Sequence, residues 1–335
     1  MKGLKNPQTN SDHLLEVRNL QTYFITYEGL AKAVDEASFW VDSGEAVGIV
    51  GESGCGKSVM ARSILRLIPD PPGRIVGGEI LFGGVNVLSL SEKEMQEIRG
   101  NKISMVFQEP MTSLNAVLTV GDQLSEVFRL HQKGSKKEAL EKSIDMLRMV
   151  GIPSPESRVM EYPFQMSGGM RQRVMIAMAL ACRPSIILAD EPTTALDVTI
   201  QAQVLELIKD LQASLGTSMV LITHDLGVIA ETVRRVYVMY TGKIVEQAEV
   251  EDIFDDPLHP YTRGLMESIP SLEGGEDKYT ERLREIPGTV PDLCALPTGC
   301  SFYPRCPQAK AVCRKEAPPM IEASRSHLAR CWFCK

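Results

Sequence analysis

Residues 46–58 read AVGIVGESGCGKS, and this stretch decides the fold. Its first five residues, 46–50, form a short apolar run, as expected of a strand buried on both faces in a parallel sheet. The next eight match the pattern G-x-x-x-x-G-K-S, in which backbone N–H groups converge on phosphate oxygens at the start of a helix. Because a strand is expected before this loop and a helix over residues 59–67 behind it, the pattern indicates a phosphate-binding loop rather than a chance glycine turn.

The side chains of this loop have separate expected roles. Lys57 should reach the β- and γ-phosphates of a nucleotide, and the Ser58 hydroxyl should bind Mg²⁺. The glycines allow the close approach of backbone to phosphate and the positive φ angles that such a loop needs. The residues predicted to contact the nucleotide here are Gly51, Glu52, Ser53, Gly54, Cys55, Gly56, Lys57 and Ser58.

A second apolar run, residues 186–189, ends in two acids. Asp190 falls at the carboxyl end of this predicted strand, where ligands bind in open α/β sheets, and it is placed to hold Mg²⁺. Glu191 can polarise the attacking water as a general base. Two adjacent acids could also be a solvated strand end, but the phosphate loop upstream favours the catalytic interpretation.

The composition limits the class of protein. A chain of 335 residues is long enough for one large domain plus an appendage, and its formal net charge of −7 argues against general nucleic-acid binding. The longest apolar run, residues 174–182, is far shorter than the roughly 20 residues that span a bilayer. Residues 1–8 lack the apolar segment of a secretory signal, so we expect a cytoplasmic protein.

Alternating strands and helices predict an α/β protein with a parallel sheet. Residues 1–13 are polar and expected to be disordered, and a nucleotide-binding domain is expected over residues 14–246. Within it, residues 92–182 should form a largely helical subdomain. Prolines become frequent further on, so residues 247–335 are predicted to be a separate extension. The helices predicted after the phosphate loop include residues 120–131, 136–150, 168–182 and about 199–215.

The order of six motifs resembles that of an ABC-transporter ATPase subunit over residues 14–245. These motifs are the phosphate loop, Gln108, Ser167-Gly168-Gly169, Asp190-Glu191, Ala195-Leu196-Asp197 and His224. The resemblance implies a P-loop NTPase fold with a mixed sheet core and a helical subdomain. It also implies that Gln108 contacts Mg²⁺ and links the site to membrane subunits, and that His224 contacts the γ-phosphate beside the catalytic Glu191.

The Ser167-Gly168-Gly169 element marks this superfamily. The resemblance implies that Ser167, Gly168 and Gly169 bind the γ-phosphate of an ATP molecule held by a second ATPase subunit, in a homodimer or a heterodimer. Ser167 is also a candidate helix N-cap, and the free N–H groups at a helix start favour an anion. Met170 stands where the family signature usually has glutamine, which removes one polar contact.

The family also places an aromatic ring on the adenine, near the first strand of the domain. Spacing selects Phe24 for this role, with Tyr23 and Tyr27 as alternatives. Any of the three rings could instead pack in the core or in a loop, and the sequence does not choose between stacking and packing.

The tail carries six of the eight cysteines within the last 42 residues. In a reducing cytosol such clustering favours metal binding over disulfides. Residues 257–263, PLHPYTR, and the segment GCSFYPRC at residues 299–306 resemble the C-terminal extension of the dipeptide, oligopeptide and nickel importer branch. The fold class expected is therefore an ABC ATPase with a small Cys-rich C-terminal extension.

Some members of that branch carry an iron–sulfur cluster on these cysteines. The resemblance implies a [4Fe–4S] cluster held by Cys300, Cys306, Cys313 and Cys331. Zn²⁺ stays an alternative, because four thiolates can bind it and Cys331 pairs with Cys334 in a C-x-x-C spacing. Unligated or oxidised cysteines are the third possibility.

These features predict an enzyme that hydrolyses ATP to drive import of dipeptides and oligopeptides across the cytoplasmic membrane. A nickel importer is the alternative, because no part of this chain is expected to touch cargo. An ABC ATPase acting on DNA or ribosomes is a further class, which the single cassette and the acidic charge disfavour. The implied partners are a second ATPase subunit, two transmembrane permease subunits and, indirectly, an extracytoplasmic substrate-binding protein, with no nucleic acid. The chain would lie peripherally on the cytoplasmic face of the membrane.

Overall fold

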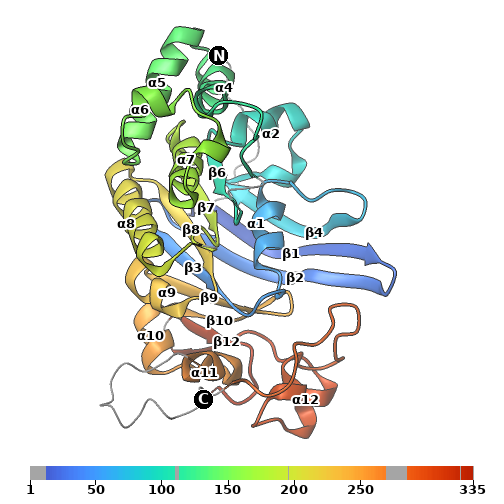
Figure 1. The fold of residues 1–335 in the computed structure, drawn as a ribbon. Coiled ribbons are helices and arrows are strands. Elements are labelled where there is room, and N and C mark those ends of the chain that lie inside the picture. The colour runs from blue at the N-terminus through green and yellow to red at the C-terminus, as the bar shows by residue number, and fades with distance from the viewer. Residues whose placement is uncertain (1–12, 110–112, 195, 269–284, 325, 335) are drawn as a thin grey trace, which may run out of the picture.

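The computed structural model describes residues 13–109, 113–194, 196–268, 285–324 and 326–334. In these residues the strands form two sheets, one of eight strands and one of four. Figure 1 shows the sheets in the middle of the molecule, helices around them, and the C-terminal segment at one end, drawn in orange to red. The predicted α/β class is confirmed.

The larger sheet is mixed. In spatial order, its strands are β11 (Ile321–Ser324), β12 (His327–Ala329), β10 (Lys243–Glu249), β9 (Arg235–Tyr240), β3 (Ala46–Val50), β8 (Ser218–Thr223), β7 (Ile186–Asp190) and β6 (Ile103–Val106). Strands β9, β3, β8, β7 and β6 are parallel, whereas β10, β12 and β11 join antiparallel at one edge. The parallel part brings the carboxyl ends of β3, β8 and β7 to one edge of the sheet.

Both faces of the parallel strands are buried, because apolar side chains occupy most of their positions. In β7, Ile186 and Leu188 belong to one core cluster, and Ile187 and Ala189 belong to the cluster on the opposite face. The first cluster fills the space between this sheet and the smaller antiparallel sheet, and the second lies under the helices. The strands of the smaller sheet are β2 (Gly29–Val41), β1 (Leu15–Thr26), β4 (Gly73–Phe82) and β5 (Val85–Asn86).

The helices lie close to their predicted positions. Those of the nucleotide-binding domain are α1 (Lys57–Ile64), α2 (Glu92–Ile98), α4 (Val120–Gln132), α5 (Lys136–Met149), α6 (Pro155–Arg158), α7 (Gly168–Leu180), α8 (Val198–Leu215) and α9 (Leu226–Thr232). Helices α4, α5 and α6 form the group at the top of Figure 1. Ser135 starts α5 with a capping box, since its hydroxyl accepts from the backbone of Glu138 and the Glu138 carboxylate accepts from the backbone of Ser135.

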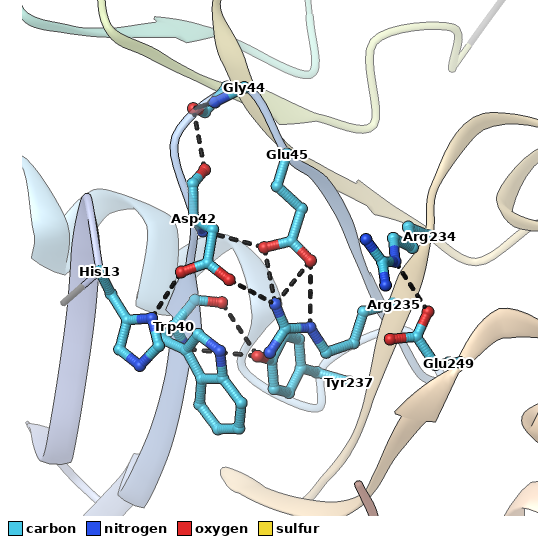
Figure 2. Close-up of polar contacts among 10 residues, drawn as sticks. His13, Trp40, Asp42, Gly44, Glu45, Arg234, Arg235, Tyr237 and Glu249 are labelled. Atoms are coloured by element: carbon cyan, nitrogen blue, oxygen red, sulfur yellow. Dashed lines mark hydrogen bonds and ion pairs between the residues drawn. The ribbon is translucent and has the colours of Figure 1, made fainter.

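A cluster of charged and aromatic side chains fixes the end of β3 that is distant from the phosphate loop (Figure 2). Nη2 of Arg235 on β9 donates to the two carboxylate oxygens of Glu45 at 2.5 and 2.6 Å. The Arg235 guanidinium also lies 4.5 Å from the centroid of the Trp40 ring, and the Tyr237 hydroxyl donates to the Trp40 carbonyl at 2.9 Å. This cluster joins the turn between β2 and β3 to the neighbouring strand.

The predicted domain limits cut across the large sheet. The boundary predicted after residue 246 lies within strand β10, and the predicted helical subdomain, residues 92–182, includes strand β6 of the sheet. The C-terminal segment adds β11 and β12 to this sheet, together with α10 (Val250–Asp255), α11 (Pro260–Glu267) and α12 (Ala311–Lys315). Of the predicted disordered residues 1–13, all but the last lie outside the described residues. Among the described helices, none has the length and apolar character needed to cross a membrane.

Candidate nucleotide-binding site

The phosphate loop joins the carboxyl end of β3 to the start of α1, as the sequence predicts. Its backbone passes close to neighbouring strands. A Cβ atom at Gly51 would lie 2.2 Å from the carbonyl oxygen of Met239, and one at Gly56 would lie 2.0 Å from that of Ala33. Gly56 also has a φ of 106°, so no other residue type fits there without strain.

The Lys57 side chain is buried and turns back over the loop. Its Nζ donates to the carbonyl oxygens of Gly51 at 2.7 Å and Glu52 at 3.0 Å. Cys55 is fully buried behind the loop, and burial raises the pKa of its thiol. Cys55 can therefore contribute only backbone groups to a ligand.

Asp190 lies across from the loop at the end of β7. The Ser58 hydroxyl donates to Asp190 Oδ1 at 2.8 Å. The carboxylate has no exposed surface, and burial raises its pKa even though the Ser58 hydrogen bond acts to lower it. Among the described residues, its second oxygen, Oδ2, has no hydrogen-bond partner. A buried carboxylate oxygen without a partner beside a hydroxyl fits the oxygen ligands that Mg²⁺ prefers.

Glu191 follows directly, with a φ of 45° that turns the chain out of the strand. Its Oε2 accepts from Gln108 Nε2 at 2.9 Å and from the Thr194 hydroxyl at 3.0 Å. Its Oε1 lies 3.4 Å from Nδ1 of His224, which follows β8. The Glu191 side chain is 12% exposed and that of His224 is 65% exposed. The structure therefore gathers Gln108, Glu191 and His224 from three adjacent strand ends.

A pocket of about 400 Å³ opens over the phosphate loop, Gln108 and Glu191, whereas Asp190 and His224 are not among its lining residues. The predicted site residues that line it are Phe24, Ser53, Gly54, Gly56, Lys57, Ser58, Gln108 and Glu191. Leu293 of the C-terminal segment lines it as well. The Tyr23 hydroxyl instead donates to Asp35 at 2.7 Å, and Tyr27 is fully exposed, so of the three candidate rings only Phe24 lines the pocket.

The Ser167-Gly168-Gly169 element lies outside the lining of this pocket. The Ser167 hydroxyl caps α7 and accepts from the backbone N–H of Met170 at 3.3 Å. Gly169 lies against Ile200 at the start of α8, and Met170 packs against the core beneath the helices. Of the motif at residues 195–197, Ala195 lies outside the described residues, and Asp197 caps α8.

The four predicted cluster cysteines, Cys300, Cys306, Cys313 and Cys331, line one small cavity in the C-terminal segment. Burial raises the pKa of the Cys300 thiol to about 11. Cys294 lies elsewhere, with Sγ 3.5 Å from the Thr26 hydroxyl of β1. Within the described residues, one group of three possible metal ligands has its ligand atoms within 4.8 Å of one another, and this group is Glu28, Asp292 and Cys294. No three of the cavity's four sulfurs are that close together.

Two residues that contact Glu52 from far along the chain were not predicted from the sequence. Arg305 binds the Glu52 carboxylate, and Tyr261 accepts from the Glu52 backbone. Arg305 directly precedes Cys306 in the Cys-rich segment, which was its one signal, and Tyr261 lies in the PLHPYTR segment. Glu52 itself is directed to these two residues and does not line the nucleotide pocket.

Comparisons with known proteins show the family of this chain. Residues 34–194 match the ABC transporter family, and residues 245–313 match the family described as oligopeptide/dipeptide transporter, C-terminal region. The "Probable peptide ABC transporter ATP-binding protein" of Sinorhizobium fredii is 56% identical over 99% of this chain and 98% of its own length. The "Oligopeptide transport ATP-binding protein" of Bacillus subtilis is 52% identical over 96% of this chain and 88% of its own length.

A solved structure is also similar. The dimeric, post-hydrolysis structure of the ATP-binding cassette MJ0796 bound to ADP and Pi has a TM-score of 0.63 and 29% sequence identity, and covers 70% of this chain and 98% of its own. The chain therefore belongs to the ATP-binding subunits of ABC transporters, which are ATPases coupled to transport, in the branch that carries the oligopeptide/dipeptide transporter C-terminal region.

Proposed function

We propose that this ATPase drives the import of dipeptides or oligopeptides through a membrane permease. The observation that carries the proposal is the near full-length similarity to two proteins named for peptide transport, together with the match of residues 245–313 to the oligopeptide/dipeptide C-terminal region. A nickel cargo is the alternative from the same branch. The chain itself is expected to touch neither, so the cargo is assigned here from similarity.

The pocket geometry supports separate roles for the residues of the phosphate loop and of the strand ends. Lys57 and the N–H groups at the start of α1 would hold the phosphates, while Ser58, Asp190 and Gln108 would hold Mg²⁺. The bound ion would supply positive charge beside the β- and γ-phosphates. Glu191 accepts the proton of the attacking water, and His224 contacts the γ-phosphate beside it.

In this structure Gln108 and Thr194 both donate to Oε2 of Glu191. The remaining oxygen, Oε1, faces His224. This arrangement fixes the carboxylate and leaves Oε1 beside His224. We place the adenine on Phe24, because that ring alone among the three candidates lines the pocket.

The Ser167-Gly168-Gly169 element acts on an ATP molecule held by another ATPase subunit. Two observations support this. The element does not line the pocket of its own chain, and the similar cassette MJ0796 was solved as a dimer with ADP and Pi. The resulting unit pairs two ATPase subunits with two permease subunits on the cytoplasmic face of the membrane, with an extracytoplasmic binding protein delivering the cargo.

We further propose that residues 247–335 act as a Cys-rich extension that holds a [4Fe–4S] cluster on Cys300, Cys306, Cys313 and Cys331. Their common cavity supports one shared ligand. Four thiolates match the ligand set of such a cluster, and tetrahedral Zn²⁺ is the alternative that the iron and zinc content of the protein distinguishes.

The transport proposal is tested by reconstituting this chain with the permease and ATPase subunits encoded beside it, in vesicles loaded with the matching binding protein. Peptides of two to five residues should stimulate ATP hydrolysis and accumulate on the side where ATP is present. Stimulation and uptake with Ni²⁺ alone, and none with peptide, would assign the chain to the nickel alternative.

The cluster proposal is tested by anaerobic purification with iron and sulfide analysis. We expect a brown protein with about four iron and four sulfide per chain. Cys306→Ser should lose this iron, whereas Cys294→Ser, which changes a cysteine outside the cavity, should keep it. Colourless protein that contains one zinc per chain would contradict the cluster.

A further inference from the structure

One residue of the phosphate loop, Glu52, is held by the C-terminal segment through both its backbone and its side chain. The Glu52 N–H donates to the Tyr261 hydroxyl at 2.8 Å. Its two carboxylate oxygens accept from Nη1 and Nη2 of Arg305 at 2.6 and 2.9 Å. Such a paired contact between a guanidinium and a carboxylate fixes orientation as well as distance. Three polar contacts therefore join the loop to residues more than 200 positions away.

The Arg305 side chain is itself rigidly placed. It is 3% exposed, and its Nε and Nη2 donate to the carbonyl oxygens of Pro287 at 3.1 Å and Ile286 at 3.3 Å. The guanidinium lies 5.9 Å from the centroid of the Tyr240 ring and 6.0 Å from that of Phe302. Burial and these contacts thus restrict the Arg305 side chain to a position in which its guanidinium faces the Glu52 carboxylate.

Tyr261 is also fixed, at the start of α11. Its ring is fully buried and lies 4.6 Å from the Tyr240 ring and 5.5 Å from that of Phe302, between centroids. The chain before it is fixed by Glu246 of β10, whose carboxylate accepts from the backbone N–H groups of Leu258 and His259. The hydroxyl of Tyr261 is consequently held against the loop by the large sheet.

These contacts matter because of where Glu52 stands. It lies between Gly51, which no side chain can replace, and the residues whose N–H groups face the pocket. The glycines of the loop give it little stiffness of its own. Glu52 does not line the pocket. Its carboxylate and its N–H therefore bind residues of the C-terminal segment, and these contacts hold the loop in place.

We propose that Arg305 and Tyr261 are positioning residues, which hold the phosphate loop in its nucleotide-binding conformation through Glu52, so that the C-terminal segment sets the affinity of the site for ATP. This inference rests on the proposed placement of ATP at residues 51–58. A loop that samples other conformations binds with an affinity reduced by the fraction of time it spends in the competent one. Removing the contacts should thus raise the Kd for ATP without changing any group that touches it.

The test measures the Kd for ATP of full-length variants by equilibrium titration, in parallel with thermal melting in the absence of nucleotide. Arg305→Gln should raise the Kd about five- to tenfold, within the range of ordinary coupling between sites. Arg305→Lys keeps the positive charge but cannot make the paired contact of a guanidinium with the Glu52 carboxylate, so it should have an intermediate effect on the Kd. Tyr261→Phe keeps the buried ring, so it should fold, and should weaken binding by a few fold.

A double-mutant cycle separates positioning from general damage. The variant with both Glu52→Gln and Arg305→Gln should bind ATP no more weakly than the poorer single variant, because both changes break the same contact. Arg263→Gln is the matched control: Arg263 is exposed on α11, and its Nε donates to the carbonyl of Pro257, distant from the loop. This control should leave the Kd unchanged.

Lys57→Ala separates the failure of this inference from the failure of the site itself. If Lys57→Ala weakens ATP binding strongly and Arg305→Gln lowers only the melting temperature, Arg305 is structural and the inference is overturned. If Lys57→Ala leaves the Kd for ATP unchanged, the placement of ATP is wrong and the inference fails with it. Additive effects in the double variant would also overturn it.

Discussion

The nucleotide site and the C-terminal segment are built by opposite means. In the site, each group stands at the end of a buried strand: the phosphate loop after β3, Asp190 and Glu191 at β7, and His224 after β8. The C-terminal segment has only short strands and helices, and besides the pairing of β12 with β10 it is joined to the rest by individual buried polar side chains. Arg305 pairs with Glu52, and Glu246 pairs with His327 at 2.7 Å.

In the nucleotide site the backbone of the sheet sets the positions of the functional groups, whereas in the C-terminal segment individual side chains set the position of the segment. A parallel sheet places the carboxyl ends of its strands at one edge whatever the surface residues are, so the site tolerates changes around it. A segment held by a few buried polar pairs depends on each of them, because removing one partner leaves a buried group without its hydrogen bonds. Substitutions can therefore disturb either region without the other.

The largest effect is expected at the strand-end site. Glu191→Gln removes the proposed general base but keeps the shape and the hydrogen-bonding ability of the side chain. ATP turnover should fall about 10³-fold, within the range for loss of general-base catalysis, while the Kd for ATP changes little. Turnover is measured by phosphate release and the Kd by equilibrium titration of the same preparation. Near-normal turnover in this variant would refute the assignment of the base.

The next effect concerns the C-terminal region. Glu246→Gln removes the negative charge of a fully buried carboxylate that accepts from Leu258, His259 and, through its ion pair, His327. The free energy of unfolding should fall by about 2–3 kcal/mol, as expected for hydrogen bonds to a buried charge. Glu249→Gln is the control on the same strand, because Glu249 forms an exposed pair with Arg234, and should change it by less than about 0.5 kcal/mol. Equal losses in both variants would contradict the importance of the buried pair.

The same carboxylate gives a pH signature. Burial acts to raise the pKa of Glu246, but the hydrogen bonds from His327 and the backbone outweigh it, so its pKa lies below the ordinary value of 4.5. The unfolded chain therefore binds a proton first as the pH falls. The stabilisation is complete above pH 4.5 and is lost as the pH falls through the lowered pKa. Acid unfolding curves should show this loss for the wild type and a smaller one for Glu246→Gln.

The same contrast explains which parts of the fold and of the site could be predicted from the sequence. Residues 51–58 and 186–191 predict both their local structure and their place at the sheet edge, because strand, loop and helix are contiguous in the chain. The contact between Glu52 and Arg305 joins residues 253 positions apart and depends on how the aromatic rings around Tyr240 pack. No spacing in the sequence encodes such a contact. For the same reason, the strand β10 could not be seen to run through the expected domain boundary at residue 246.

A smaller effect is expected at the adenine end of the pocket. Phe24→Ala should weaken ATP binding about tenfold, as expected for loss of one ring stacked on a base. Tyr27→Ala is the matched control three residues further along the chain, in the turn after β1, with a side chain that is fully exposed, and it should leave the Kd within about twofold. The two variants are compared by equilibrium titration with ATP. If Tyr27→Ala had the larger effect, the ring on the adenine would be the alternative aromatic rather than Phe24.

The smallest effect is expected at Met170, where the signature departs from the family pattern. The contact that fixes the start of α7 uses the backbone N–H of Met170 and the hydroxyl of Ser167, so it does not depend on the side chain at residue 170. The Met170 side chain packs at the edge of the core, where a glutamine of similar length can keep its stem in place while its amide reaches solvent. ATP turnover of the assembled transporter should therefore change by less than about threefold in Met170→Gln. Ser167→Ala, which removes the cap, should be clearly more damaging, since a lost N-cap alone costs about 1 kcal/mol. The reverse order would mean that the departure at residue 170, and not the cap, determines how this signature acts on the partner's nucleotide.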